Sequence, residues 1–152
     1  MKRFNFLYIA FYLSLFVILS GCGSSSKNVD EHNRICPECH MPLKEKNINT
    51  AHIINDAHSI YFDDIGCMIL YTHGNKIDIK KVDAEVFTND THKYIDAYKA
   101  TYTINEQTPM HYGFGAYEKK RKDTISFDDV VLKMLRGENM ANPKIRKQIL
   151  GY

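Results

Sequence analysis

The order of apolar and polar residues in the first part of the chain predicts a β-hairpin followed by a helix. Two short apolar runs, Ala51–Ile54 and Ser59–Phe62, are separated by a segment typical of a turn between strands. Asp63 and Asp64 follow, at a position where helix-capping residues are expected. The apolar residues after them recur at helical spacing, and we predict that this helix ends near Gly74.

The middle of the chain predicts further strands. Residues 82–88 have the composition of a strand, and residues 98–104 alternate between apolar and polar side chains, as a half-buried strand does. Gly113 and Gly115 lie close together in the segment 110–117. Glycines in such a place indicate a turn or a close approach of the backbone beside a strand.

Two helices are predicted towards the end of the chain. Apolar residues recur at helical spacing over Phe127–Leu135, with Asp128 and Asp129 in the first turn, where acidic side chains are favourable. A shorter helix is predicted after Pro143. Strands and helices are mixed and no tandem repeat is visible, so we expect one α+β domain over residues 35–152.

The first residues have the pattern of a bacterial lipoprotein signal. Lys2 and Arg3 precede an almost uninterrupted apolar run over residues 4–19. Small residues then lead to Cys22, as in a lipobox whose cysteine becomes the lipidated first residue of the mature protein. An uncleaved transmembrane helix is the alternative, but the run is short of the roughly 20 residues that a bilayer span needs. We therefore expect residues 1–21 to be a removed signal peptide.

The lipid anchor and the net charge indicate that this protein associates with a membrane and not with a nucleic acid. Acyl chains on Cys22 are expected to hold the protein on the periplasmic side of the inner or outer membrane. Residues 22–34 are Ser-rich and polar, and we predict a flexible tether there. The chain has 20 Lys+Arg and 18 Asp+Glu, and these numbers become equal once Lys2 and Arg3 leave with the signal. A formally neutral domain gives no indication of nucleic-acid binding.

The cysteines give the first indication of chemistry. Beyond Cys22 the chain has Cys36, Cys39 and Cys67, and this odd number leaves at least one thiol without an intramolecular partner. The Cys-x-x-Cys spacing of the first two lets both sulfurs face one metal ion. The same pair also fits a structural disulfide, a redox-active dithiol or, with His40, the Cys-x-x-Cys-His signature of c-type haem attachment.

Binding of a soft metal is the fourth interpretation of this segment. A methionine lies two residues after the second cysteine, another follows Cys67, and a third stands beside a histidine further along the chain. Thiolate and thioether donors suit Cu(I), and a thioether binds without losing a proton. The candidate metal ligands are Cys36, Cys39, Met41, Cys67, Met110 and His111.

Other polar residues fit structural roles. Asp63 and Asp64 are better explained as helix caps than as a catalytic pair. An enzyme of the organomercurial-lyase type needs paired thiols and a carboxylate and could recruit Cys36, Cys39 and Asp63, but only fold-level analogy supports it. A lipoprotein with one disulfide and a buried Cys67 is the structural alternative. The other histidines share no ligand spacing and are expected at the surface or in turns: His32, His52, His58, His73 and His92.

A series of motifs resembles the NosL family, the accessory lipoproteins of nitrous oxide reductase. They occur in the family's order and spacing and cover most of the mature domain. They are Cys36-x-x-Cys39-x-Met41, Tyr-Phe-Asp-Asp-Ile-Gly-Cys-Met at 61–68, Tyr-Ile-Asp-Ala at 94–97 followed by Ala-Thr-Tyr at 100–102, Thr-Pro-Met at 108–110, and Gly-Phe-Gly-Ala-Tyr at 113–117.

This resemblance implies a NosL/MerB-like fold with two β-β-α-β-type halves in one compact domain. It also implies a chaperone that delivers Cu(I) to nitrous oxide reductase in the periplasm, beside an ABC-type Nos transporter complex. Such a protein transfers its metal and is not an enzyme. Met110 is the methionine of the Thr-Pro-Met motif and, by the resemblance, a metal ligand.

One position departs from the family pattern. Members of the family usually have glycine between the second cysteine and the methionine, where this chain has His40. The change creates the haem signature, so a c-type haem held by Cys36, Cys39 and His40 in an electron-transfer lipoprotein is the principal alternative. The segment after residue 119 is also shorter than the family pattern.

Overall fold

The computed structural model describes residues 35–43, 51–55 and 59–152. The predicted signal peptide, the lipidated Cys22, the tether over 22–34 and most of the hairpin turn lie outside these residues. Within the described ranges no helix combines the length and the apolar character needed to cross a bilayer.

A four-stranded antiparallel sheet forms the larger part of the domain. Its strands are β1 (Ala51–Ile54), β2 (Ser59–Phe62), β3 (Asp83–Phe87) and β4 (Tyr94–Asp96), in the order β2-β1-β3-β4. The predicted hairpin is confirmed, because β1 and β2 pair directly in antiparallel register. The central strand β1 is the most buried, which agrees with its almost continuous apolar sequence.

Helix α2 (Ile65–Gly74) packs against β1 and β2 and begins and ends where the sequence predicted. Asp64 is its N-cap: the side-chain oxygen accepts a hydrogen bond from the backbone N–H of Gly66 at 2.9 Å. The first residues of the helix are fully buried, Ile65 and Cys67 among them. The short 3-10 turn η2 (Ile79–Lys81) then leads into β3.

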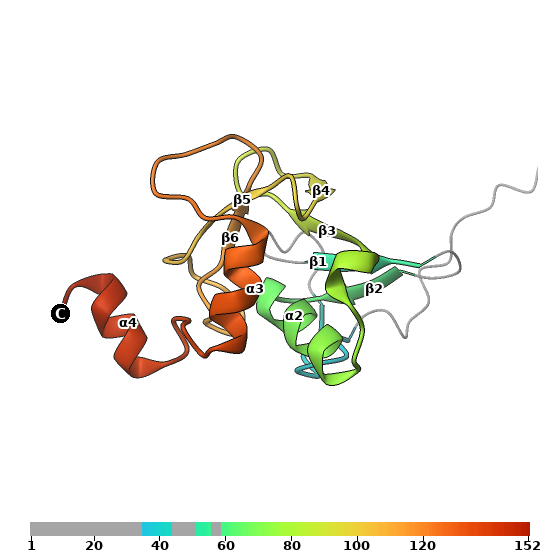
Figure 1. Ribbon diagram of the computed structural model, residues 1–152, viewed down its shortest axis with the longest axis horizontal. Helices are drawn as coiled ribbons and strands as arrows, with labels where there is room; N and C mark the ends of the chain where they lie inside the picture. Colours follow the sequence, from blue (N-terminus) through green and yellow to red (C-terminus); the bar gives the residue numbers. More distant parts are fainter. Residues whose placement is uncertain (1–34, 44–50, 56–58) are drawn as a thin grey trace, which may run out of the picture.

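A smaller two-stranded sheet and two helices complete the structure. Antiparallel strands β5 (Thr101–Thr103) and β6 (Gly115–Tyr117) lie beside α3 (Phe127–Leu135), which packs against both α2 and β5 (Figure 1). Helix α4 (Pro143–Leu150) has no buried residue and projects from the rest of the domain (Figure 1). Both helices lie where the sequence predicted them.

The strand predicted over 98–104 is shorter than expected, and β4 was not predicted. Asp96 ends β4 in a tight turn: its carboxylate accepts a hydrogen bond from the Tyr98 N–H at 2.8 Å, and its carbonyl accepts one from Ala100. Tyr98 is therefore 41% exposed instead of lying on the buried face, whereas Tyr102 is fully buried. A local hydrogen-bonding aspartate overrides the alternation at this point.

The predicted close approach of backbone at the paired glycines is confirmed. Gly113 has φ +87°, and a Cβ there would lie 2.6 Å from the carbonyl oxygen of Ile104. Glycine adopts this conformation without the steric cost that other residues meet.

The architecture is mixed α+β, as predicted. The larger sheet is built by elements in the order β1-β2-α2-β3, which is a β-β-α-β arrangement. The second part runs β5-β6-α3 and continues, within the described residues, into α4 instead of a strand.

Candidate metal centre

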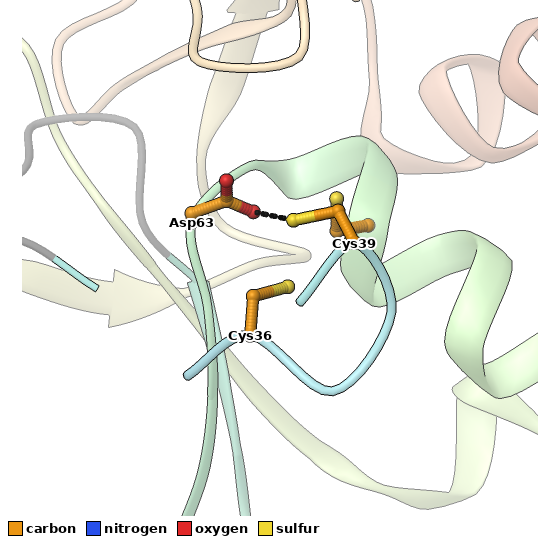
Figure 2. A group of neighbouring side chains, drawn as sticks. Cys36, Cys39 and Asp63 are labelled. Carbon is orange, nitrogen blue, oxygen red and sulfur yellow. Dashed lines mark hydrogen bonds between the residues drawn. The ribbon is translucent and has the colours of Figure 1, made fainter. Parts of the chain in front are cut away.

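Three separate segments bring Cys36, Cys39, Asp63 and Cys67 together. One potential ligand atom from each residue lies within 4.8 Å of the others. The loop 35–43 contributes the first two cysteines. Asp63 follows β2 directly, and Cys67 lies in the first turn of α2. Figure 2 shows Cys36, Cys39 and Asp63 pointing towards one another.

The loop that contributes two of the thiols is closed by backbone hydrogen bonds. The N–H of Cys36 donates to the carbonyl of Met41, and the N–H of His40 donates to the carbonyl of Cys36, both at 2.9 Å. A bridge between Ile35 and Pro42 joins the two ends of the loop. This closure turns the Cys36 and Cys39 side chains towards the same place.

His40 has φ 61°, in the left-handed region that glycine occupies freely and other residues avoid. The histidine side chain is exposed. The tight loop therefore holds this histidine in a backbone conformation that favours glycine.

Asp64 fixes the start of α2 and links it to a distant loop. One carboxylate oxygen caps the helix, and the other accepts a hydrogen bond from the backbone N–H of Met110 at 3.2 Å. The carboxyl group is fully buried, and this desolvation raises its pKa to about 6 despite its hydrogen bonds. The 108–112 loop is thereby held against the residues that precede Cys67.

The three thiols have different proton affinities. A hydrogen bond from the Cys67 thiol lowers the pKa of Cys36 to about 6, burial opposes this shift, and the backbone N–H groups of Cys39, Asp63 and Glu38 lower the pKa further. The cluster therefore favours the deprotonated form of Cys36 over that of its two neighbours. Hydrogen bonding to Cys36 and burial raise the pKa of Cys67 well above its ordinary value.

Cys39 retains its proton beside a carboxylate. Burial raises its pKa to about 12, and the neighbouring Asp63 and Cys36 add to the increase. The Cys39 Sγ donates to Asp63 Oδ1 at 3.2 Å (Figure 2). None of the three described cysteines is in a disulfide. This group of three sulfurs and one carboxylate can hold a metal ion.

The structure brings only some of the predicted ligands together. Cys36, Cys39 and Cys67 converge, whereas His111 is exposed and lies outside this group. The Met41 side chain is 45% exposed. Met110 is partly buried against the hydrophobic core, and its backbone bonds to Asp64.

The sequence interpretation assigned Asp63 to helix capping, and that role was wrong for this residue. Asp64 alone caps α2, whereas Asp63 accepts a hydrogen bond from Cys39. A signal was present, since only one of two consecutive aspartates can occupy an N-cap position. Asp63 directly follows the buried strand residue Phe62, so its carboxylate needs a different partner.

The expectation that His52 lies at the surface or in a turn was also wrong. It is buried in β1, where its Nε2 lies 3.1 Å from Glu85 Oε2 and its ring contacts Tyr61 and Tyr94. His73 and His92 are exposed, as expected. The other two histidines of that group, at 32 and 58, lie outside the described residues.

Comparisons with known proteins give no relative for this chain: it matches no protein-family model, no curated protein and no solved structure. Its function is consequently inferred from the cluster of Cys36, Cys39, Asp63 and Cys67. Three sulfur donors in one small group favour soft, thiophilic metals over hard cations.

Proposed function

We propose that this protein is a Cu(I) carrier that binds the ion through Cys36, Cys39 and Cys67. The observation that carries this proposal is the convergence of three free thiols, two from the loop 35–43 and one from α2. Cu(I) is a soft ion that two or three thiolates satisfy, and it needs no further ligand. Cys36, whose pKa is lowered within the cluster, is the natural first ligand.

The exposures of the three thiols suggest a direction for metal transfer. Cys36 and Cys67 are fully buried, whereas Cys39 is only partly buried and lies on the surface loop. A partner's ligand reaches the ion from the Cys39 side and displaces that thiolate first. The buried thiolates leave afterwards, so the ion passes between proteins without being released into solution. Ligand exchange of this kind involves no turnover, and the proposed protein is not an enzyme.

The recipient follows from the resemblance to the NosL family. That resemblance points to nitrous oxide reductase as the acceptor, to an ABC-type Nos transporter complex as neighbour, and to a lipid anchor at Cys22 on the periplasmic side. The backbone of His40 supports it, because the structure has a glycine-like conformation where the family has glycine. A NosL/MerB-like fold is part of the same proposal.

Competition for Cu(I) with a chromophoric chelator, under anaerobic reducing conditions, tests the proposal. Replacing Cys36, Cys39 or Cys67 singly by Ser is expected to weaken binding by about a hundredfold or more, since even outer-shell changes at metal sites cost roughly 10–100-fold. His73→Ala is the control, because this exposed side chain lies outside the cluster, and its affinity should stay within about threefold. Wild-type Cu(I) affinity in all three Ser variants would rule out the thiol site.

Met110 needs a separate variant, because the resemblance and not the cluster identifies it as a ligand. Met110→Leu keeps the volume of the side chain and removes its thioether. A weaker Cu(I) complex in this variant would add Met110 to the ligand set. An unchanged affinity would restrict the set to the three thiolates.

A c-type haem remains the alternative for the Cys36–His40 segment. Haem attachment would require both thiols to reach a porphyrin edge, whereas Cys36 is fully buried with its sulfur within 4.8 Å of that of Cys67. Its burial therefore favours the metal over the haem. Expression in a host with haem-maturation machinery decides between them: a haem-sized mass increase that survives denaturation would establish thioether attachment.

The hydrogen bond between Cys39 and Asp63 favours one second candidate function, cleavage of a carbon–mercury bond. The Cys36 thiolate would bind mercury, and the proton shared by Cys39 and Asp63 would pass to carbon as that bond breaks, releasing the hydrocarbon. Incubation with methylmercury tests it directly. Release of methane by the wild type, but not by Asp63→Asn, would support cleavage of the carbon–mercury bond. Binding of methylmercury without release of methane would exclude this activity.

A further inference from the structure

The carboxylate of Asp63 is surplus to a Cu(I) site. Cu(I) is satisfied by two or three sulfurs and gains little from a hard oxygen donor. Asp63 is nevertheless only 2% exposed, and its Oδ1 lies 3.2 Å from Cys39 Sγ. Carboxylates are rarely buried unless paired, hydrogen-bonded or bound to a metal, so its place beside three thiols calls for a chemical reason.

The four donors have the composition and spacing of a tetrahedral divalent site. In such a site zinc–sulfur bonds are about 2.3 Å and zinc–oxygen bonds about 2.0–2.2 Å, which places neighbouring ligand atoms roughly 3.5–3.8 Å apart. The Cys39–Asp63 pair is already near that separation, and all four atoms lie within 4.8 Å of one another. Movements of about 1 Å or less in the side chains would complete the tetrahedron.

We propose that Asp63 gives the site a second binding mode, in which a divalent d10 cation of the Zn(II) class is held by Cys36, Cys39, Cys67 and Asp63. This inference rests on the proposed function in that both ions use the same three thiolates. It does not depend on delivery to a partner. Zn(II) has no redox chemistry and accepts mixed sulfur and oxygen ligands in tetrahedral geometry, which fits this donor set.

The charge balance agrees with this choice. Three thiolates and one carboxylate carry four negative charges, and a divalent ion neutralises one more of them than Cu(I) does. Buried charges are costly unless compensated, so a buried carboxylate is better matched by the divalent ion. Cu(I) would leave Asp63 outside its coordination sphere.

This second mode provides a holding state for the thiols. While Zn(II) occupies the site, no two sulfurs are free to join in a disulfide. Arrival of Cu(I) exchanges one ion for the other: the three thiolates move to copper, Asp63 is released, and Zn(II) leaves with no change of oxidation state. The greater affinity of thiolates for the softer ion drives the exchange.

The test compares Zn(II) and Cu(I) affinities of the full chain in detergent micelles, under anaerobic reducing conditions. Asp63→Asn keeps the side-chain volume and removes the anionic donor. It is expected to lower Zn(II) affinity at least about tenfold while leaving Cu(I) affinity within about threefold. Asp83→Asn, an exposed carboxylate on β3, is the matched control and should change neither affinity. Equal Zn(II) affinity in wild type and Asp63→Asn would overturn the inference.

A measurement on the unmodified chain covers the case in which Asp63→Asn misfolds. X-ray absorption at the zinc edge should show three sulfur and one oxygen neighbour, and Co(II) substitution should give the visible bands of a tetrahedral thiolate site. A zinc shell without sulfur, or with sulfur alone, would overturn the inference. Binding of Zn(II) through Asp63 without any Cu(I) binding would instead refute the copper carrier and leave this inference standing.

Discussion

The thiol cluster and the His52–Glu85 pair both bury titratable side chains, but they are assembled in different ways. His52 and Glu85 are direct partners across β1 and β3, so the register of the sheet alone brings them together. The cluster joins a surface loop, the end of β2 and the first turn of α2. It depends on tertiary packing that no single element provides.

The two sites also differ in what their polar atoms do. Burial lowers the pKa of His52, and Glu85 opposes this shift, so the fold favours a neutral imidazole whose Nε2 lies 3.1 Å from Glu85 Oε2. The cluster instead places three sulfurs and a carboxylate within reach of one ion. We infer that the pair contributes stability and that the cluster is arranged for binding.

The largest expected effects are on Cu(I) affinity and on stability, and one pair of variants distinguishes them. Cys67→Ala is expected to weaken Cu(I) binding about a hundredfold or more, with a loss of only about 1 kcal/mol in the free energy of unfolding. His52→Ala is expected to lower the free energy of unfolding by about 2–4 kcal/mol, because it removes a buried ring and leaves Glu85 without this partner.

Chelator competition and urea unfolding, applied to both variants, measure the two quantities. Cu(I) affinity of His52→Ala should remain within about threefold of the wild type. If His52→Ala lost affinity as strongly as Cys67→Ala, the two regions would be energetically coupled and the contrast between them would fail.

A second prediction concerns the packing that places Cys67. A Cβ added to Gly66 would overlap the ring of Tyr112, so Gly66→Ala forces the 108–112 loop away from α2. We expect a loss of about 1–3 kcal/mol in the free energy of unfolding and a weaker metal site. Gly74→Ala is the matched control on the same helix, because nothing lies within 4 Å of its added Cβ. Alanine has the higher helix propensity, so Gly74→Ala should not lower stability. A loss as large in Gly74→Ala as in Gly66→Ala would show that the Tyr112 contact is not responsible.

The pH dependence of stability should carry the signature of His52. Its pKa is lowered in the folded state, so the unfolded chain binds the proton more tightly. The stabilising effect is present above the unfolded pKa of about 6.5 and is lost as the pH falls below it, with a slope of at most about 1.4 kcal/mol per pH unit. Urea unfolding between pH 7 and pH 5 should show a steeper loss for the wild type than for His52→Gln.

Asp64 also contributes to the pH dependence of stability, so the effect of His52 has to be measured as the difference between the wild type and His52→Gln. Burial raises its pKa to about 6, so its contribution to stability is greatest at low pH and is lost as the pH rises through that value. This opposes the His52 effect in the wild type and in His52→Gln alike. Identical pH profiles in the two proteins would mean that His52 is not held neutral by the fold.

The smallest expected effect is a gain in stability. His40→Gly removes the cost of a positive φ in the loop, and we expect about 1 kcal/mol more stability in thermal unfolding of the metal-free protein. His92→Gly, in another turn with φ 52°, is the comparison and should gain a similar amount. Cu(I) affinity should not fall in His40→Gly, whereas a marked fall would assign the imidazole a role in binding.

Helices were the best predicted part of the fold, for local reasons. Asp64 is the N-cap of α2, and Ser126 is the N-cap of α3, where its side chain and that of Asp129 form a capping box. Periodicity and caps lie next to each other in the sequence, so they can be read without knowing the tertiary structure. β4 has only three half-buried residues, which gave no alternation to detect.

Only those site residues could be predicted whose metal-binding chemistry few other residue types share. The number and spacing of the cysteines identified Cys36, Cys39 and Cys67 as candidates, because few residues other than cysteine provide a soft ligand. Asp63 was grouped with Cys36 and Cys39 only by analogy with an organomercurial lyase and was otherwise assigned to capping, since aspartate at a helix start has a common structural explanation. The contact that distinguishes it, to Cys39, joins two segments whose packing the sequence does not reveal.

The closed loop over 35–43 has a consequence for the motions of the domain. Two of the thiols lie on this loop and the third on α2, so a bound ion would tie a surface segment to the most buried helix. Amide hydrogens of Cys36 and His40, which hold the loop closed, would then exchange with solvent only when α2 itself opens. Metal loading would thus be visible as slowed exchange in a segment that touches the ion at only two side chains.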